Sequence, residues 1–202
     1  MLMSLPRRNQ RLGDLKPQEG NQVEAGGRMQ FNGNMEAAVT LFRITIEDEI
    51  YYSEFNSNYD RKTVRKGIET DLKWYPKPSL FIWGNYSYTD ARFEGGDETV
   101  PLVPSHKGSM GVEWEAVHGL TLSATGTYVG SRNDGNDAEY YSYKKLDAYQ
   151  VFDTKATYKK NTLTFFVGVN NLLDELYETS SYSESYYPMP GRNFYAGAEM
   201  RF

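Results

Sequence analysis

The densest run of oxygen-bearing side chains lies between residues 133 and 139. It reads Asn133-Asp134-Gly135-Asn136-Asp137 and is followed by Glu139. Carboxylate and amide oxygens are the ligands that Ca²⁺ takes in proteins, so a calcium loop is one interpretation of this run. The spacing, however, does not follow the EF-hand pattern. We therefore predict a solvated acidic loop here and no metal site.

The two histidines are the other residues with obvious chemistry. His106 and His118 fall in different connections, at opposite ends of the strands predicted below, so joint binding of one metal is not expected. Ser105 precedes His106, but a catalytic triad is defined by its arrangement in space and not by adjacency in sequence. The chain has no Cys, which excludes disulfides and thiol chemistry. We predict that it is not an enzyme and holds no cofactor.

Tyrosine is the residue type best suited to ligand contact in this chain. There are 17 Tyr, and aromatic residues make up 15% of the sequence. Many lie in long polar stretches, where a ring can stack on a ligand or lie at the level of lipid headgroups. Close to predicted strand ends, Tyr51, Tyr52 and Tyr177 are better explained by packing or by an interfacial girdle. The predicted substrate contacts are Tyr140, Tyr141, Tyr143, Tyr182, Tyr186 and Tyr187.

The elements that must position these residues are strands. Apolar and polar residues alternate with a period of two, which is typical of strands with two different faces. Most of the segments hold the roughly 9–11 residues that a tilted strand needs to cross a bilayer. The nine segments are about 22–32, 35–50, 63–74, 80–90, 107–116, 120–130, 147–159, 163–172 and 192–202.

Segment 120–130 shows the alternation most clearly. One face carries Leu120, Leu122, Ala124 and Tyr128, and the other carries Thr121, Ser123, Thr125 and Thr127. We expect the first set to face lipid and the second to face a lumen. Segment 35–50 is less regular, because Val39 and Leu41 have the opposite parity to Phe42, Ile44 and Ile46. That pattern indicates either a bulge or two buried faces.

The connections between the segments alternate in length. Short, turn-like sequences occur at 33–34, 75–79, 117–119 and 160–162, and long polar stretches occur at 51–62, 91–106, 131–146 and 173–191. Short turns at one rim and long loops at the other are typical of outer-membrane barrels. The predicted fold class is therefore all-β: part of an antiparallel up-and-down transmembrane β-barrel, with short periplasmic turns and long extracellular loops.

Composition limits the classes of protein to which this chain can belong. The mean hydropathy of −0.67 and the lack of any run of about 18 apolar residues exclude a transmembrane helix. A barrel is compatible with this composition, since its lumen and loops are polar. The net charge is −5 with no basic stripe, so nucleic acid is not an expected partner. The start of the chain lacks the apolar core of a secretory signal, which leaves the origin of an export signal open.

Several segments, taken in order, resemble TonB-dependent outer-membrane receptors. The similar stretches are Asp14-Leu15-Lys16-Pro17 with 21–26, 42–50, 67–69 with 85–91, 101–106, Val169-Asn170-Asn171-Leu172-Leu173-Asp174 with Tyr177, and 190–194 with the terminal Phe202. The last strand alternates up to that Phe202. Gly197, Met200 and Phe202 resemble the C-terminal signal that the barrel assembly machinery recognises, although Phe202 is equally explained as a lipid-facing aromatic.

The resemblance implies a protein of the Gram-negative outer membrane. Such receptors carry siderophores, cobalamin or similar nutrients through a barrel of about 22 strands that encloses a plug, and they draw energy from TonB. Residues 1–21 are then an extracellular loop segment, and residues 22–202 are C-terminal barrel strands without the plug or TonB box. The implied partners are outer-membrane lipid, the assembly machinery, an unknown small molecule, and TonB only through that plug.

The number of predicted strands leaves the nature of the chain open. Nine is odd, whereas single-chain bacterial barrels normally have an even count. We therefore expect part of a receptor barrel, and leave open whether it is a fragment, a remnant or a complete product. The alternative is a small standalone barrel with a structural or adhesive role. Whether nine strands close, oligomerise or stay open does not follow from the sequence.

Overall fold

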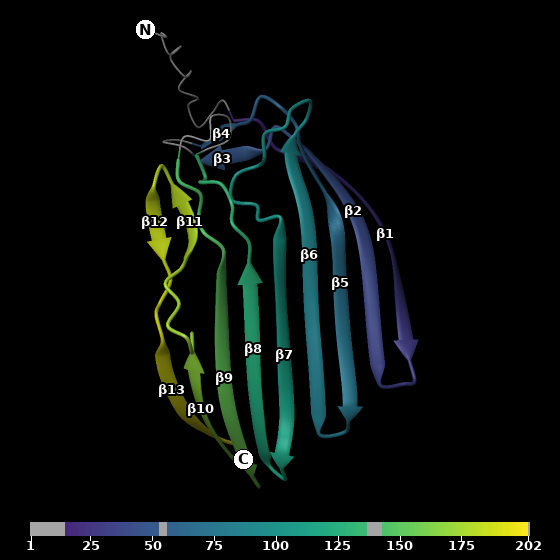
Figure 1. Ribbon diagram of the computed structural model, residues 1–202, viewed down its shortest axis with the longest axis vertical. Coiled ribbons are helices and arrows are strands. Elements are labelled where there is room, and N and C mark those ends of the chain that lie inside the picture. Colours follow the sequence, from purple (N-terminus) through teal and green to yellow (C-terminus); the bar gives the residue numbers. More distant parts are fainter. Residues whose placement is uncertain (1–14, 53–55, 137–142, 202) are drawn as a thin grey trace.

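The computed structural model describes residues 15–52, 56–136 and 143–201, which form strands, turns and loops (Figure 1). Nine strands form one antiparallel sheet in the order β1-β2-β5-β6-β7-β8-β9-β10-β13. Neighbours in this sheet are therefore neighbours along the chain, apart from two short hairpins inserted in loops. This confirms the predicted antiparallel up-and-down fold. No helix among these residues is long and apolar enough to cross a membrane.

The strands fall where the alternation predicts them. Their bounds are β1 (Glu19–Phe31), β2 (Met35–Glu47), β5 (Thr63–Lys77), β6 (Leu80–Phe93), β7 (His106–Val117), β8 (Leu120–Val129), β9 (Tyr149–Lys160), β10 (Leu163–Asn170) and β13 (Asn193–Met200). The first strand begins at Glu19, so the last three residues of the segment 1–21, predicted as loop, belong to the sheet. Residues 1–14 lie outside the described residues.

Two hairpins occupy stretches that the sequence predicts as loops. β3 (Ile50–Tyr52) pairs with β4 (Asn56–Asn58), and β11 (Glu178–Tyr182) pairs with β12 (Ser185–Pro188). The β11–β12 turn has left-handed backbone at Ser183 (φ 50°) and Glu184 (φ 61°). Hairpin turns of this kind usually contain Asn-Gly or Asp-Gly. Because this turn contains neither, the second hairpin carries no sequence signal.

The short connections lie together at one end of the sheet, and the long loops lie at the other (Figure 1). The turn between β1 and β2 shows how the short ones form. Asn32 (φ 47°) and Gly33 (φ 70°) both adopt left-handed backbone, and the Asn34 amide donates to the Phe31 carbonyl at 3.1 Å. Two consecutive left-handed residues give the turn that matches strand twist.

Cross-strand register divides the sheet into an apolar face and a polar face. Leu122 lies opposite Trp114 on one side and Ala156 on the other, so the three side chains share a face. Side chains at every second position of a strand lie on one face, and paired residues on neighbouring strands share that face. The residues connected in this way to Leu122 form the apolar face. Its exposed large side chains are Val23, Met29, Phe31, Val39, Leu41, Leu72, Trp74, Tyr86, Tyr88, Met110, Trp114, Leu122, Tyr128, Tyr158, Leu163, Phe165, Val167, Phe194 and Met200.

The polar face has the opposite parity. Thr121, Ser123, Thr125 and Thr127 share it, on the opposite side from Leu120, Leu122, Ala124 and Tyr128, as the alternation predicts. The irregular parity of β2 does not reflect a bulge, because its register with β1 and β5 continues without a break. Instead Val39 and Leu41 lie on the apolar face, and Phe42, Ile44 and Ile46 lie on the polar face. Both faces of β2 therefore carry apolar side chains.

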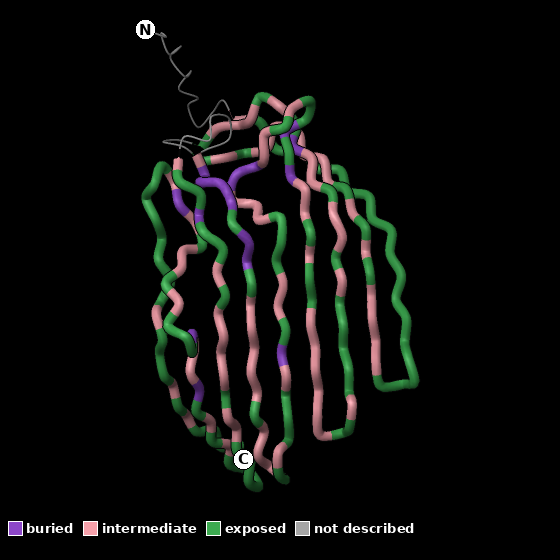
Figure 2. The backbone as a smooth tube through the Cα atoms, in the orientation of Figure 1, coloured by how far each residue is buried: buried purple, intermediate pink, exposed green. Residues whose placement is uncertain are grey.

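Buried residues gather at the long-loop end and are sparse along the strands (Figure 2). The buried apolar side chains are Ala91, Phe93, Val100, Val129 and Leu146, and Thr63, Arg132, Asn133, Asp134 and Ser181 are polar side chains buried with them. The sheet itself is single-layered within the described residues. The long loops thus have a small core of their own, which gives them defined structure.

Candidate functional site

Asp134 is a central residue of the small core at the long-loop end of the sheet, which we call the rim. Its side chain is fully buried, and its carboxylate accepts hydrogen bonds from the backbone amides of Asn136 (2.9 Å), Ser183 (2.8 Å) and Glu184 (3.1 Å). The Ser181 hydroxyl donates a further bond at 2.7 Å. The carboxylate therefore fastens the tip of the β11–β12 hairpin to the loop between β8 and β9.

This environment changes the interpretation of the run 133–139. Burial alone would raise the pKa of Asp134, but the hydrogen bonds that its carboxylate accepts outweigh burial and hold that pKa below its usual value. The predicted solvated loop is wrong for Asn133 and Asp134, which are buried. No cluster of potential metal ligands occurs among the described residues. Asp137 and Glu139 lie outside them.

Arg132 joins the same loop to β9 and β11. Its guanidinium is buried, donates to the Glu178 carbonyl at 2.5 Å, and lies 5.5 Å from the ring centroid of Tyr149. The Tyr149 ring in turn packs against Tyr177, with centroids 4.4 Å apart. Tyr177 thus packs within the loops, as predicted from its position near a strand end, and it also lines the hollow described below.

The β6–β7 loop and the β2–β5 loop also contribute to the small core of the rim. Asn133 donates to the Thr99 hydroxyl at 2.8 Å, which ties the β6–β7 loop to the β8–β9 loop. In the β2–β5 loop, Tyr59 stacks on Tyr51 with centroids 4.2 Å apart and meets Phe93 edge to face. Burial, together with the Glu49 carboxylate, raises the pKa of Tyr59 well above its usual value. The rim is therefore one packed unit.

The predicted ligand tyrosines have different positions in this unit. Tyr182 packs edge to face between Tyr52 (5.9 Å) and Tyr187 (6.2 Å). Tyr187 is 56% exposed, and Tyr186 is 39% exposed and lines a hollow described next. Tyr143 is partly exposed beside the same loop. Tyr140 and Tyr141 lie outside the described residues. Ligand contact by these six side chains stays a prediction.

A hollow of about 390 Å³ opens at the rim between the β8–β9 loop and the β10–β11 connection. Tyr149, Tyr177 and Tyr186 line it, together with the exposed side chains of Lys144 and Lys145. The ammonium of Lys144 pairs with Asp147 at 3.6 Å in an exposed ion pair, whereas Lys145 forms no ion pair with a described residue. Asp147 and Glu178 also line the hollow, which therefore combines aromatic rings with charges of both signs.

Sequence reasoning missed the lysines of this hollow. Lys144 and Lys145 follow directly after the tyrosine-rich stretch that ends at Tyr143, and that adjacency was the available signal. Ammonium groups offer several donors to an anion, and aromatic rings offer flat apolar surface. Because Lys145 has no ion-pair partner among the described residues, its ammonium is the group in the hollow that can meet an anionic ligand, and the rings can contact aromatic groups of that ligand.

The predicted assembly residues have a structural role that is visible in the sheet. Gly197 lies opposite Phe166 on the polar face, and Gly168 on β10 lies opposite Tyr195 on β13. A Cβ atom at either glycine would stand less than 3 Å from the facing ring. Met200 is exposed on the apolar face opposite Leu163, and Phe202 lies outside the described residues. Recognition by the assembly machinery stays a prediction.

Comparison with protein families settles what kind of barrel this sheet belongs to. The family model described as TonB dependent receptor-like, beta-barrel matches residues 5–172. The chain belongs to this family. TonB-dependent receptors are outer-membrane proteins of Gram-negative bacteria, so the apolar face is the lipid-facing surface and the polar face is the interior surface. The short turns are periplasmic and the long loops extracellular.

Individual relatives are siderophore receptors. The chain is 28% identical, over 94% of its length, to the catecholate siderophore receptor Fiu of Escherichia coli K12, of which it covers 26%. It is 28% identical, over 85% of its length, to the ferrioxamine receptor of Yersinia enterocolitica, again covering 26%. The chain therefore spans about a quarter of the length of these curated relatives.

Solved structures show the same barrel. The closed form of Fiu from E. coli K12 matches with a TM-score of 0.76 at 28% identity, covering 94% of this chain and 28% of that one. The ferric yersiniabactin uptake receptor FyuA from Yersinia pestis matches with a TM-score of 0.77 at 19% identity, covering 92% and 30%. The second likeness concerns the fold alone.

Proposed function

We propose that this chain is the C-terminal part of the barrel of an outer-membrane receptor that imports ferric siderophores. The family match and the ordered motifs support the barrel, and the names of the relatives support the ligand class. Those names are a catecholate siderophore receptor, a ferrioxamine receptor and a ferrichrome transporter. Transport is a property of the whole receptor. This chain covers about a quarter of the length of the receptors that it resembles.

The observation that carries the ligand proposal is the hollow at the extracellular rim. A ferric catecholate complex is anionic and presents flat aromatic rings. Tyr149, Tyr177 and Tyr186 supply aromatic surface around the hollow. Lys144 is paired with Asp147, and Glu178 also lines the space, so Lys145 supplies the ammonium that has no ion-pair partner among the described residues. Among siderophores, this combination favours the catecholate class over neutral or cationic hydroxamate complexes.

Energy coupling is proposed to run through TonB and a plug domain. The family model that matches is that of the barrel, so these residues supply the wall and the rim and not the contact with TonB. The polar face, with its threonines, serines and ion pairs, is suited to surround such a plug. Outer-membrane lipid and the assembly machinery complete the proposed partners.

The test is uptake by the full gene product that carries this chain. It should be expressed in Gram-negative cells that lack catecholate receptors, with and without TonB. We expect TonB-dependent accumulation of radioactive iron supplied as a ferric catecholate, and weaker accumulation of iron supplied as ferrioxamine. Iron uptake that does not require TonB, or no uptake of any siderophore, would refute the proposal and favour the standalone structural barrel.

Variants connect the proposal to the hollow. Lys145→Gln and Tyr186→Ala should each weaken binding of the ferric catecholate by roughly fivefold to tenfold, since each removes a contact worth about 1 kcal/mol. Lys160→Gln removes the same charge at the periplasmic end of β9 and should leave binding unchanged. Equal weakening by all three substitutions would place the ligand elsewhere.

A further inference from the structure

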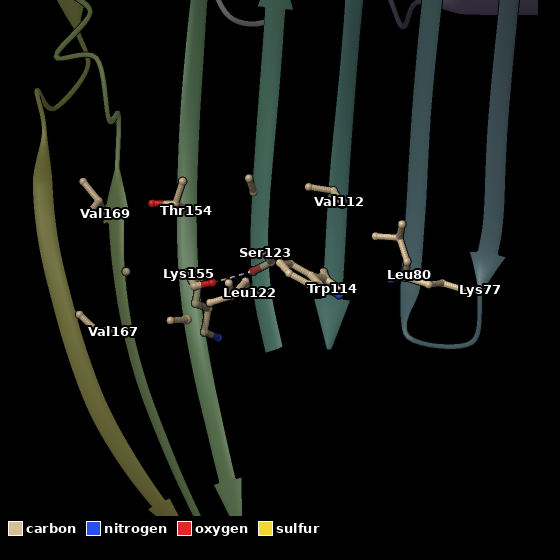
Figure 3. A pocket seen from close by; sticks show the side chains of 13 residues that line it. Lys77, Leu80, Val112, Trp114, Leu122, Ser123, Thr154, Lys155, Val167 and Val169 are labelled. Atoms are coloured by element: carbon tan, nitrogen blue, oxygen red, sulfur yellow. Dashed lines mark hydrogen bonds between the residues drawn. The ribbon is translucent and has the colours of Figure 1, made fainter. Parts of the chain in front are cut away.

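A groove of about 630 Å³ crosses the lipid-facing surface over β7 to β10, in the half nearer the periplasmic turns (Figure 3). Its floor consists of the small side chains Ala124, Thr154 and Ala156, which the register places side by side on β8 and β9. Trp114 and Leu122 are larger and form one wall. The surface is therefore hollowed where small residues lie between large ones.

The groove is lined mostly by hydrocarbon, and the hydroxyl of Thr154 is the hydrogen-bonding group that its floor carries. The Ser123 hydroxyl, at its edge, already donates to the Lys155 carbonyl at 3.3 Å (Figure 3). The opposite wall is formed by Val167 and Val169 of β10. An occupant that lies in the groove must therefore present an apolar chain, because a polar group there would lose its hydrogen bonds to water.

One end of the groove carries a cation. Lys77 lies in the last position of β5, at the short-turn rim, and its ammonium is 5.8 Å from the ring centroid of Trp114. It forms no ion pair with a described residue. A lysine at this rim lies at the level of the headgroups of the inner leaflet, where its natural partner is a phosphate.

We infer that this groove binds an anionic phospholipid of the inner leaflet, with one acyl chain over Ala124 and Ala156 and the phosphate at Lys77. The groove is continuous with the lipid-facing surface, which makes a lipid its occupant. The position at the periplasmic rim selects inner-leaflet phospholipid over lipopolysaccharide, which lies in the outer leaflet. Lys155 also contributes to the lining, but its ammonium lies 5.0 Å from the centroid of the Phe166 ring, and Phe166 belongs to the interior surface. Lys77 is therefore the cation at the end of the groove, and it favours a headgroup with net negative charge.

Native mass spectrometry of the full gene product tests this inference. The receptor, purified in detergent, is mixed with phosphatidylglycerol or phosphatidylethanolamine of the same acyl chains, and the bound fraction is measured. We expect tighter binding of phosphatidylglycerol, and a roughly fivefold loss of that preference in Lys77→Gln. Lys73→Gln is the matched control, because Lys73 lies on the same strand but on the interior surface, near Glu36.

A second variant fills the groove itself. Ala156→Phe should reduce binding of both phospholipids, and heat-modifiable migration on gels shows whether it has folded. Equal binding of the two lipids by wild type, an equal effect of Lys77→Gln and Lys73→Gln, or binding of lipopolysaccharide alone would overturn the inference. Because no siderophore is present, failure here leaves the proposed transport function untouched.

Discussion

The ring of Phe166 on β10 lies directly over Gly197 on β13, so close that a Cβ atom at Gly197 would stand 2.4 Å from ring atom Cζ. The ammonium of Lys155 lies 5.0 Å from the centroid of the same ring. An aromatic ring over a strand glycine covers backbone that would otherwise be bare. Gly197, which the sequence suggests as part of an assembly signal, is therefore also a packing site.

Adding a methyl group at this site should destabilise the barrel. Gly197→Ala forces the Phe166 ring or a strand to move, and such overpacking costs about 1–3 kcal/mol. The free energy of unfolding, measured by urea denaturation of the receptor in vesicles, gives the effect. Gly84→Ala is the control, because the nearest atom to a Cβ at Gly84 is 3.6 Å away, an ordinary contact.

A double substitution separates packing from recognition. In Gly197→Ala combined with Phe166→Ala, the methyl group has room, so the loss should be smaller than the sum of the two single losses. If the double variant is stable after refolding but still fails to assemble in cells, the glycine is read by the assembly machinery. Strict additivity would contradict the packing role.

Asp134→Asn should loosen the β11–β12 hairpin. The amide keeps the shape of the carboxylate but replaces one acceptor oxygen with a donor, which then faces the Ser183 or Glu184 amide. Hydrogen bonds to a charged group are worth about 1.5–3 kcal/mol. Hydrogen exchange at these two amides should accelerate accordingly. Asp97→Asn changes a fully exposed carboxylate and should have no such effect.

Acid should loosen the same hairpin in the wild-type protein. The pKa of Asp134 is lower in the folded state than in the unfolded chain, so the folded state binds fewer protons. The resulting stability is complete above the unfolded pKa of about 3.9 and is lost as the pH falls through the lower folded pKa. Amide exchange in the hairpin should therefore rise only below about pH 4. In Asp134→Asn this acid transition should be absent.

The sheet could be predicted from the sequence because its information is local. A period of two along each strand, together with short turns such as the one predicted at 33–34, gives the strands and their order without knowledge of tertiary contacts. The rim could not be predicted in this way. Asp134 accepts hydrogen bonds from residues 181–184, almost fifty positions away in the sequence, and no local pattern predicts that pairing. Burial of a run of Asn and Asp is the opposite of what composition suggests.

The sequence pattern indicates only some residues of the candidate site, because the others are brought together by tertiary contacts. Tyr186 is among the ligand contacts predicted from residue type and loop position; it lines the hollow, and its contact with a ligand stays a prediction. Lys144 and Lys145 were not expected there, because a pair of lysines in a polar loop is ordinarily solvated. The two lysines line a hollow because the β10–β11 connection packs against residues 144–149.

The two faces of β8 should respond differently to charge. Leu122→Arg places a guanidinium on the lipid-facing surface and should be destabilising. Such a substitution costs about 2–4 kcal/mol at the midplane, and the cost here should lie below that range because Leu122 is the third residue of β8 from the periplasmic turn. Thr125→Arg lies on the interior surface and should cost much less. Unfolding of the receptor in vesicles measures both. Spin labels along 120–128 should alternate in their accessibility to a lipid-soluble quencher, and uniform accessibility would contradict the assignment of faces.

Arg65 should hold the β2–β5 loop in place through Glu49. Its guanidinium donates to both carboxylate oxygens of Glu49, at 3.0 and 2.7 Å, and to the Thr63 hydroxyl at 2.8 Å. The Arg65 and Glu49 side chains are only 16% and 17% exposed, and the Glu49 carbonyl accepts the Tyr59 amide. Arg65→Met leaves a largely buried carboxylate without its cationic partner, although the Thr63 hydroxyl still donates to it, and should destabilise the loop by about 1–3 kcal/mol.

Protease cleavage within residues 50–62 measures this loosening, which exposes the Tyr59 ring and its neighbours. Lys62→Gln is the control, since Lys62 pairs with Glu47 at a site where both side chains are 44% exposed, and such pairs contribute less than about 1 kcal/mol. Glu49→Gln should restore resistance in Arg65→Met, because the uncompensated charge is then removed. Cleavage that stays equally fast in the double variant would show that the loop depends on the arginine's packing and not on the ion pair.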